Sequence, residues 1–349
     1  MLYAANDTSA EAVAWRSRGD VQYAQRFLDT NPGWLHSRRA VDLGHTRIRL
    51  SDLAFGFEVG LGPVKHPVKV PAGIGVTSFG VYSEQSVTDA AMLHELLWRV
   101  QPSLVVEVGT MCGGSAIFLA RTMMGYNPAS RVLTFDLKRP EKQSGGRKCL
   151  QANQGFRSPQ WKALQESGNL VSIVGDVTSP ENMERIRGEA RRANGTFVVD
   201  DASHVAAPTI RHFAALSRFV SVGGYYLVQD TRLDYDCALS VLTMKPDNVF
   251  WYCRRLLAEG GPAAAVEKIM ANVTAEASSR GATNRGRAAG SRRRGRGAAE
   301  WIQDRDCEKW IITQHPGGYL RRVRPPPPAA RLDDDVPAHT APQRERRRS

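Results

Sequence analysis

The chain has 349 residues, 42% of them hydrophobic, and a formal net charge of +12, so it can form one large domain or two small ones. The charge is uneven: residues 275–298 carry +6, residues 321–349 carry +4, and +2 remains for the rest. Because the folded part is nearly neutral, the basic composition argues only weakly for a nucleic-acid partner. No apolar run reaches the roughly 18 residues of a membrane span, and Met1 to Asp20 lacks a signal-peptide core, which predicts a soluble cytoplasmic protein.

The cysteines show no pattern of paired ligands. There are five of them, at Cys112, Cys149, Cys237, Cys253 and Cys307. No two form a Cys-x-x-Cys pair and the total is odd, so we expect neither a disulfide framework nor a zinc site. A reducing compartment fits this usage.

Residues 1–68 are expected to form an N-terminal helical and lead-in segment. Apolar residues recur at helical spacing from Glu11 to Leu28, and Asn31-Pro32-Gly33 predicts a turn. Residues 63–73 are too rich in proline for a helix, so they form either an ordered loop over the active site or a linker. An amphipathic helix is predicted from Thr88 to Val100.

Apolar runs then alternate with helical patterns. The predicted strands are Leu104–Val108, Val132–Asp136, Leu170–Val174, Phe197–Asp200 and Tyr225–Gln229, and the predicted helices lie around Ile117–Met124, Glu181–Arg192 and Ala207–Phe219. This alternation predicts a parallel sheet with helices on both faces. The chain closes with Trp310–Thr313, a Pro-Gly-Gly turn at 316–318 and Tyr319–Val323, which predicts an antiparallel hairpin. The fold class is therefore α/β and Rossmann-like, a mostly parallel seven-stranded sheet with a C-terminal antiparallel hairpin.

Two stretches lack periodicity and cannot bury enough apolar surface to fold. Residues 275–298 form an Arg/Gly-rich low-complexity insertion, and residues 325–349 form a Pro/Arg-rich tail; both are predicted to be disordered. The folded α/β domain is expected to span residues 69–274 and 299–324.

The segment from Val106 to Ser115 joins a predicted strand to a predicted helix through glycines, as at the nucleotide-binding corner of doubly wound domains. Its spacing is Glu-x-Gly-x-x-x-Gly-Gly, which differs from the Gly-x-Gly-x-x-Gly of dinucleotide sites and favours S-adenosylmethionine over NAD. The candidate cofactor-binding residues here are Glu107, Gly109, Thr110, Gly113, Gly114 and Ser115.

Two later strand ends offer further cofactor contacts. Asp136 could bind the ribose hydroxyls, or it could be a turn residue at the end of its strand. Asp176, with Val177 beside it, could reach the adenine amine after the third strand.

Acidic and amide residues follow the fourth and fifth strands. If these strands are adjacent and parallel, Asp201, Gln229 and Asp230 converge on one hard cation, for which Mg²⁺ suits the oxygen ligands. His204, on the same edge, is the candidate catalytic base for a substrate hydroxyl. Alternatively, Asp200 or Ser203 only caps the next helix.

These motifs resemble the cephalosporin hydroxylase family, which includes rhamnosyl O-methyltransferases. The resemblance runs from about Lys69 to Val323 through Glu-Val-Gly-Thr-Met-Cys-Gly-Gly-Ser, Gly-Asp-Val-Thr, Val-Asp-Asp-Ala-Ser-His and Gly-Gly-Tyr-Tyr-Leu-Val-Gln-Asp-Thr. It implies a methyltransferase fold and S-adenosylmethionine-dependent, Mg²⁺-assisted transfer to a hydroxyl of a sugar or small metabolite. The Asp-Asp-x-Ser-His element also resembles macrolide-sugar O-methyltransferases, which implies that Asp201 holds Mg²⁺ and His204 is the base.

Two departures from the family pattern leave alternatives open. Gln229 stands where the family has Glu, which removes a negative charge and should weaken metal binding. The Arg/Gly tract interrupts the path to the final hairpin, as a surface-loop insertion or as an artefact of the gene model. The alternatives are a catalytically impaired cofactor-binding protein and an RNA-associated protein acting through its arginine tracts. The expected partner is a small-molecule or saccharide substrate, with homo-oligomerisation left open.

Overall fold

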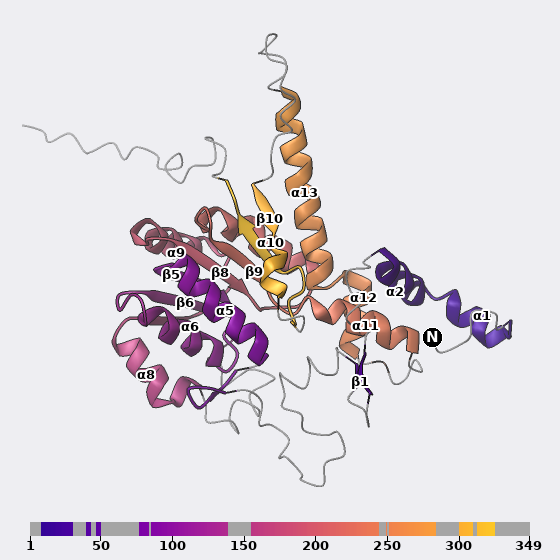
Figure 1. The fold of residues 1–349 in the computed structure, drawn as a ribbon, viewed down its shortest axis with the longest axis horizontal. Coiled ribbons are helices and arrows are strands. Elements are labelled where there is room, and N and C mark those ends of the chain that lie inside the picture. Colours follow the sequence, from indigo (N-terminus) through magenta and orange to yellow (C-terminus); the bar gives the residue numbers. More distant parts are fainter. Residues whose placement is uncertain are drawn as a thin grey trace, which may run out of the picture.

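At the centre of the molecule lies a seven-stranded sheet in the order β10-β11-β9-β8-β5-β6-β7 (Figure 1). The computed structural model describes residues 8–30, 40–42, 47–49, 77–83, 85–138, 155–243, 249, 251–283, 300–309 and 313–324. The strands are β5 (Leu104–Val108), β6 (Arg131–Asp136), β7 (Leu170–Val174), β8 (Thr196–Asp200), β9 (Tyr225–Val228), β10 (Trp301–Gln303) and β11 (Tyr319–Arg322). The adjacent strands β9, β8, β5, β6 and β7 are parallel to one another, and β11 runs antiparallel to both β9 and β10. The predicted fold class is confirmed.

One arm of the predicted hairpin is wrong. The strand that pairs with β11 is β10, with Trp301 opposite Arg322, and not the stretch Trp310–Thr313. Within that stretch, residues 310–312 lie outside the described residues, and the Thr313 hydroxyl donates to a buried carboxylate on a helix. The short strand β10 was missed because it has one buried apolar side chain, Trp301, which lies only three residues after the end of the arginine tract.

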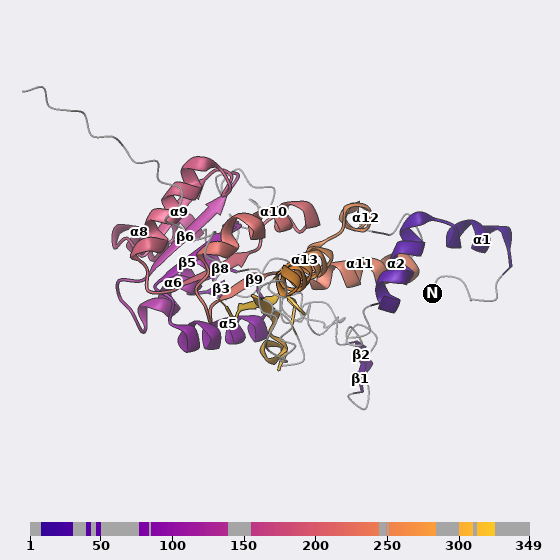
Figure 2. The same ribbon diagram turned by 90° about the horizontal axis from the view of Figure 1, so that it is seen from above.

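Helices of the described part of the chain cover both faces of the sheet (Figure 2). They are α5 (Val87–Val100), α6 (Gly114–Met124) and α8 (Pro159–Glu166) on one face, and α9 (Pro180–Arg192), α10 (Ala206–Leu216) and α13 (Pro262–Thr283) on the other. The strands alternate between the two cores: Val105 packs with Leu96 and Ile117, whereas Val106 packs with the opposite layer. Strands buried on both faces appear in the sequence as continuous apolar runs, which is why most of their bounds were predicted within a residue.

Smaller elements complete the described part of the chain. The helices α1 (Ala10–Arg16) and α2 (Gly19–Thr30) confirm helical structure near the N-terminus, as two helices rather than one. They pack on α11 (Arg232–Thr243) and α12 (Trp251–Glu259), where Trp15 and Val21 join the same core as Val241. Short strands and 3₁₀ turns are β1 (Ala40–Asp42), β2 (Arg47–Arg49), β3 (Thr77–Ser78), β4 (Val81–Tyr82), η3 (Gly155–Arg157), η4 (Ser217–Phe219) and η7 (Arg305–Glu308). The predicted turn at 31–33 and the proline-rich stretch 63–73 lie outside the described residues.

The helix α13 extends beyond the predicted end of the domain (Figure 1). Disorder was predicted from residue 275, but residues 275–283 continue the helix to Thr283. The prediction was wrong there because alanines, which favour helices, continue past residue 275, and a helix that has already formed is easily extended. Residues 284–299 and the tail 325–349 lie outside the described residues, so the rest of both disorder predictions is untested.

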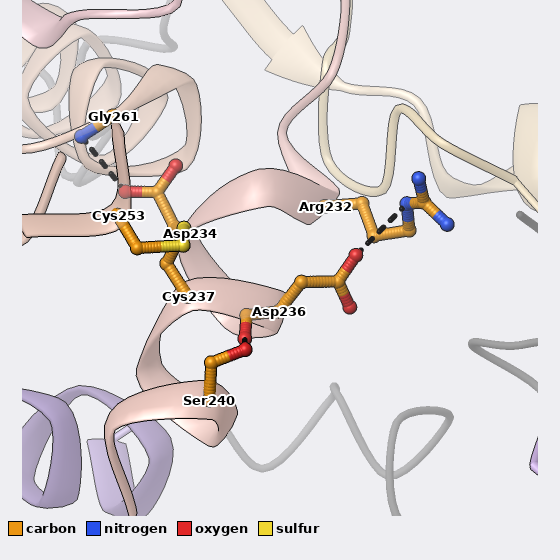
Figure 3. Close-up of a disulfide and its surroundings, with 7 residues drawn as sticks. All are labelled: Arg232, Asp234, Asp236, Cys237, Ser240, Cys253 and Gly261. Atoms are coloured by element: carbon orange, nitrogen blue, oxygen red, sulfur yellow. Dashed lines mark hydrogen bonds and ion pairs between the residues drawn. A yellow bond between two sulfur atoms is a disulfide. The ribbon is translucent and has the colours of Figure 1, made fainter. Parts of the chain in front are cut away.

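The sequence predicted no disulfide framework, and the disulfides in the structure contradict this prediction. Cys237 on α11 and Cys253 on α12 form a disulfide, with their Cα atoms 4.9 Å apart (Figure 3). Cys112 is disulfide-bonded as well, and Cys307 is a buried free thiol. Sequence spacing missed the first pair because its members are 16 residues apart and meet only when two helices pack together. The cysteines therefore no longer support a reducing compartment. Among the described helices, none is both long and apolar enough to cross a membrane.

Candidate active site

The glycine segment, Val106–Ser115, begins at the end of β5. At this strand the order of the strands in the sheet changes direction. From β5 the chain continues to β6 and β7 on one side, whereas β8 and β9 lie on the other side. The amide of Gly109 donates to Phe135 on β6 at 2.8 Å, and the amide of Asp201 donates to Val108 on β5 at 2.8 Å. In open α/β sheets ligands bind outside the carboxyl ends of strands at such a switch point. The predicted cofactor corner and the Asp201 segment therefore lie side by side.

Close contacts within the protein account for the three glycines. A Cβ at Gly109 would overlap the carbonyl oxygen of Asp201, and one at Gly114 would overlap that of Tyr82. At Gly113, whose φ is +82°, a Cβ would overlap the ring of Trp161 on α8. The sequence had assigned these glycines to the approach of a ligand, and it gave no sign of Tyr82 or Trp161.

Hydrogen bonds hold the loop after β5 in place. The amides of Thr110 and Met111 donate to Oδ2 of Asp136 at 3.2 and 3.1 Å. The hydroxyls of Thr110 and Thr134 lie 2.6 Å apart, and the Thr134 hydroxyl donates to Oε2 of Glu107 at 2.5 Å. Asp136 therefore holds the loop after β5 in its conformation, a larger role than that of a turn residue at the end of its own strand. Its proposed contact with the ribose hydroxyls stays a prediction.

Glu107 is a fully buried carboxyl group at the end of β5. Burial raises its pKa to about 7, and hydrogen bonds from Ser115 and Thr134 oppose the shift. The nearby carboxylates of Asp201 and Asp136 raise the pKa further. A carboxyl group held at the edge of ionisation is suited to accept a cationic ligand group, which would favour its charged form.

Asp201, His204 and Asp230 lie together at the sheet edge, where the sequence predicted Asp201, Gln229 and Asp230 as metal ligands and His204 as the base. Nε2 of His204 lies 3.2 Å from Oδ1 of Asp201 and 3.3 Å from Oδ2 of Asp230. One ligand atom from each of the three residues lies within 4.8 Å of the other two, close enough to hold a single metal ion. Burial raises the pKa of Asp201 to about 6; the hydrogen bond to His204 opposes the shift and the Asp230 carboxylate adds to it.

Gln229 precedes Asp230 at the same edge of the sheet. Its side chain is buried, and its Nε2 atom has no hydrogen-bond partner. Its backbone amide donates to Asp200 at 3.0 Å, which keeps it level with the end of β8. The two carboxylates supply the oxygen ligands that a hard divalent cation prefers, whereas an amide can offer such an ion only its oxygen.

The residues predicted for the adenine have local roles. Oδ1 of Asp176 accepts the amide and the hydroxyl of Thr178 at 2.8 and 2.7 Å, in the turn that precedes α9. The backbone bond from Thr178 is the main cause that lowers the pKa of Asp176. Val177 is buried in the core, so only its backbone is available to a ligand.

The capping alternative fails for Asp200. Its carboxylate accepts the Tyr226 hydroxyl at 2.9 Å and lies 3.2 Å from Nδ1 of His212 on α10. It faces the core opposite to that of Glu107, so it ties α10 to the sheet and does not cap the helix. The hydroxyl of Ser203 accepts the amide of Val205 at 3.4 Å. No side chain caps the start of α10, where Val205 is the N-cap residue.

His315 and Asp89 contribute to the site but were not predicted. Nδ1 of His315 accepts the backbone amide of Asp230 at 2.9 Å, and Nε2 lies 3.9 Å from Oδ2 of Asp89. His315 lies in the stretch assigned to the final hairpin, and this assignment hid its role. A histidine beside the Pro-Gly-Gly turn was the available signal.

The strand order, the single antiparallel strand β11, and the glycines and acidic residues at the carboxyl ends of the parallel strands define a Rossmann-like protein of the methyltransferase type. The chain belongs to the Rhamnosyl O-methyltransferase/CmcI family, whose model matches residues 75–275.

Curated relatives include two rhamnosyl O-methyltransferases. The protein of Mycobacterium leprae (strain TN) is 26% identical over 159 residues, which cover 45% of this chain and 61% of that protein. The protein of Mycobacterium tuberculosis (strain ATCC 25618 / H37Rv) is 27% identical over 158 residues, which cover 45% and 58%. The match thus spans about three-fifths of the length of these relatives.

Solved structures with a similar fold are more distant. CmcI with Mg and SAM is 16% identical, with a TM-score of 0.39, over 75% of this chain and 87% of that chain. The O-methyltransferase of Bacillus cereus in complex with SAH is 16% identical, with a TM-score of 0.33, over 66% and 82%. The fold assignment therefore rests on the sheet topology given above.

Proposed function

We propose that the protein transfers a methyl group from S-adenosylmethionine to a hydroxyl of a sugar or small metabolite, with the help of a divalent metal ion. The observation that carries the proposal is the placing of the glycine segment beside the cluster of Asp201, His204 and Asp230. A cofactor corner and a cluster able to hold a metal and move a proton meet at one edge of the sheet. Membership of a family with rhamnosyl O-methyltransferases supports a sugar hydroxyl as the acceptor.

Each part of the site has a role in this reaction. Asp201, Gln229 and Asp230 would hold the metal. The cofactor would be bound by Glu107, Gly109, Thr110, Gly113, Gly114, Ser115, Asp136, Asp176 and Val177. When bound, the metal would lower the pKa of the substrate hydroxyl and orient its oxygen. Nε2 of His204 would take the proton of the substrate hydroxyl, and bound S-adenosylmethionine would supply the methyl group that the hydroxyl oxygen attacks, with a neutral thioether as the leaving group. The flanking carboxylates stabilise the resulting imidazolium.

Chelation tests the proposal directly. We expect the purified protein to transfer labelled methyl groups from S-adenosylmethionine to a rhamnoside acceptor, and EDTA to abolish the transfer. Added Mg²⁺ should restore it, because the carboxylates hold the ion only reversibly. If calorimetry detects no S-adenosylmethionine binding, or if EDTA leaves the transfer rate unchanged, the proposal fails in its cofactor or its metal part respectively.

A second candidate is a protein that binds the cofactor but has lost efficient catalysis. Gln229 favours it, because an amide replaces a charged ligand at the metal site. Cofactor binding without turnover at saturating Mg²⁺, for every sugar acceptor tested, would support this alternative.

Replacing Gln229 by Glu should tighten Mg²⁺ binding about tenfold. The added carboxylate supplies a full negative charge to a half-buried cation site, where charge count tunes affinity. Isothermal titration calorimetry of both proteins with Mg²⁺ measures the change, and Gln229→Leu, which should weaken binding, is the control. Equal affinities in all three proteins would show that this side chain does not reach the ion.

A cytoplasmic location, a small-molecule partner and self-association stay predictions. The disulfide between Cys237 and Cys253 counts against a reducing compartment.

A further inference from the structure

Asp230 has an unusual backbone conformation for a residue that must present a carboxylate. Its φ is +55°, in the left-handed region that few non-glycine residues adopt. It directly follows β9 and Gln229, at the point where the chain leaves the sheet. Something must hold the backbone in this conformation for Oδ2 to remain 3.3 Å from His204.

His315 makes the contact that fixes this backbone. Its ring is buried, and its Nδ1 accepts the Asp230 amide at 2.9 Å. Since Nδ1 is the acceptor, the neutral ring must carry its proton on Nε2. Nε2 has no hydrogen-bond partner and lies 3.9 Å from Oδ2 of Asp89, a carboxylate that favours the protonated nitrogen.

Asp89, near the start of α5, anchors the loop that carries His315. Its Oδ1 accepts the Thr313 hydroxyl at 2.5 Å, and its Oδ2 accepts the Gln314 amide at 2.8 Å. Asp89 is 1% exposed, so water does not compete for these bonds. The loop is thereby pinned on one side to α5.

The other side of the same loop is joined to the residues after Asp230. The Thr231 hydroxyl donates to the carbonyl of Pro316 at 2.7 Å, and the Arg232 amide donates to the carbonyl of Gln314 at 3.1 Å. These two bonds and the one from the Asp230 amide join residues 230–232 to residues 314–316, and of the three the Asp230 bond is the one made to the histidine ring.

We propose that His315, held in place by Asp89, is a positioning residue that sets the Asp230 carboxylate for metal binding. The inference rests on the proposed function, because it presupposes that Asp230 holds a divalent ion. Removing a group that hydrogen-bonds to a metal ligand and orients it typically lowers metal affinity 10- to 100-fold. Here the oriented group is a backbone amide, so the effect passes through the conformation of Asp230 and not through its charge.

The test compares three variants in Mg²⁺ titrations by calorimetry, with S-adenosylhomocysteine present. We expect His315→Ala to raise the Kd for Mg²⁺ about 10- to 100-fold. His315→Asn should stay within about threefold of the parent, because its side-chain oxygen can replace Nδ1 as acceptor. Thr231→Val, which breaks a different bond between the same two segments, should also stay within about threefold. Metal-free binding of S-adenosylhomocysteine should be unchanged in all three, which shows that they are folded.

Several results would overturn the proposal. An unchanged Kd in His315→Ala would exclude the positioning role while leaving the metal site intact. An equal loss in Thr231→Val would assign the effect to general anchoring of the loop. If the parent protein bound no Mg²⁺ at all, the metal part of the proposed function would fail together with this inference. Nitrogen NMR of the metal-free protein gives a separate readout: a proton on Nδ1 of His315 would contradict the geometry.

Discussion

Replacing His204 by Ala should lower the rate of methyl transfer by about 10²- to 10⁴-fold, the usual contribution of a general base. Binding of S-adenosylhomocysteine should persist, because none of the predicted cofactor contacts involves this side chain. The measurement is single-turnover methyl transfer at saturating Mg²⁺, with cofactor affinity measured in parallel. A variant that keeps more than about a tenth of the parent rate would refute the role of base.

The geometry also allows His204 to be a metal ligand. Comparing two variants of His204 in methyl transfer and Mg²⁺ binding distinguishes this role from that of the base. Its Nε2 lies within 4.8 Å of ligand atoms from both carboxylates, so it could be a third metal ligand. His204→Gln places an amide oxygen near that position, and this oxygen can coordinate a cation but cannot take a proton at neutral pH. If His204 is the base, the Ala and Gln variants are equally slow and both bind Mg²⁺ like the parent. If it is a ligand, Ala weakens Mg²⁺ binding and Gln recovers part of the affinity and the rate.

The central sheet was predictable because its strands are buried on both faces. The predicted Leu104–Val108 and Leu170–Val174 match β5 and β7 residue for residue, and the others differ by a residue at one end. Such strands show continuous apolar runs bounded by polar or glycine residues. β10 has three residues and one buried apolar anchor, so it offers no such signal.

The cluster of Asp201, His204 and Asp230 was predictable for a different reason. The ends of adjacent parallel strands meet at one edge, so polar residues directly after two such strands must converge. No comparable rule brings Asp89 to Thr313, because 224 residues separate them and the contact arises only when α5 packs beside the final loop. The internal neighbours of the glycines were missed for the same reason: Trp161 lies on a helix with no sequence link to Gly113.

Replacing Glu107 by Gln should stabilise the ligand-free protein at alkaline pH while it weakens cofactor binding. Burial raises the pKa of Glu107 from 4.5 in the unfolded chain to about 7 in the folded protein. Between these values the folded state holds a proton that the unfolded chain has released. The stabilisation from this proton is therefore complete below pH 4.5 and is lost as the pH rises to about 7, a change of about 3 kcal/mol.

A glutamine avoids that loss and keeps an oxygen that accepts the Thr134 hydroxyl. The variant should therefore match the parent below pH 4.5 and exceed its stability progressively up to pH 7, with a melting temperature several degrees higher at pH 8. Urea unfolding across this pH range measures the difference. Asp200→Asn is the matched control, because that carboxylate is also buried but accepts bonds from Tyr226 and His212, so its loss should destabilise the protein at neutral pH.

The same substitution should have the opposite effect on cofactor affinity, which it should lower. Measuring this affinity decides whether the buried Glu107 carboxylate serves ligand binding or only the fold. A cationic group of the cofactor would favour ionised Glu107, so the parent should bind S-adenosylhomocysteine more tightly as the pH rises from 5.5 to 7. Glu107→Gln should bind at least about tenfold more weakly at pH 8 and lose most of this pH dependence. A variant that is more stable and binds just as well would mean that Glu107 serves only the fold. A variant that gains stability and loses affinity would show that the site retains an unfavourable buried carboxylate for its ligand.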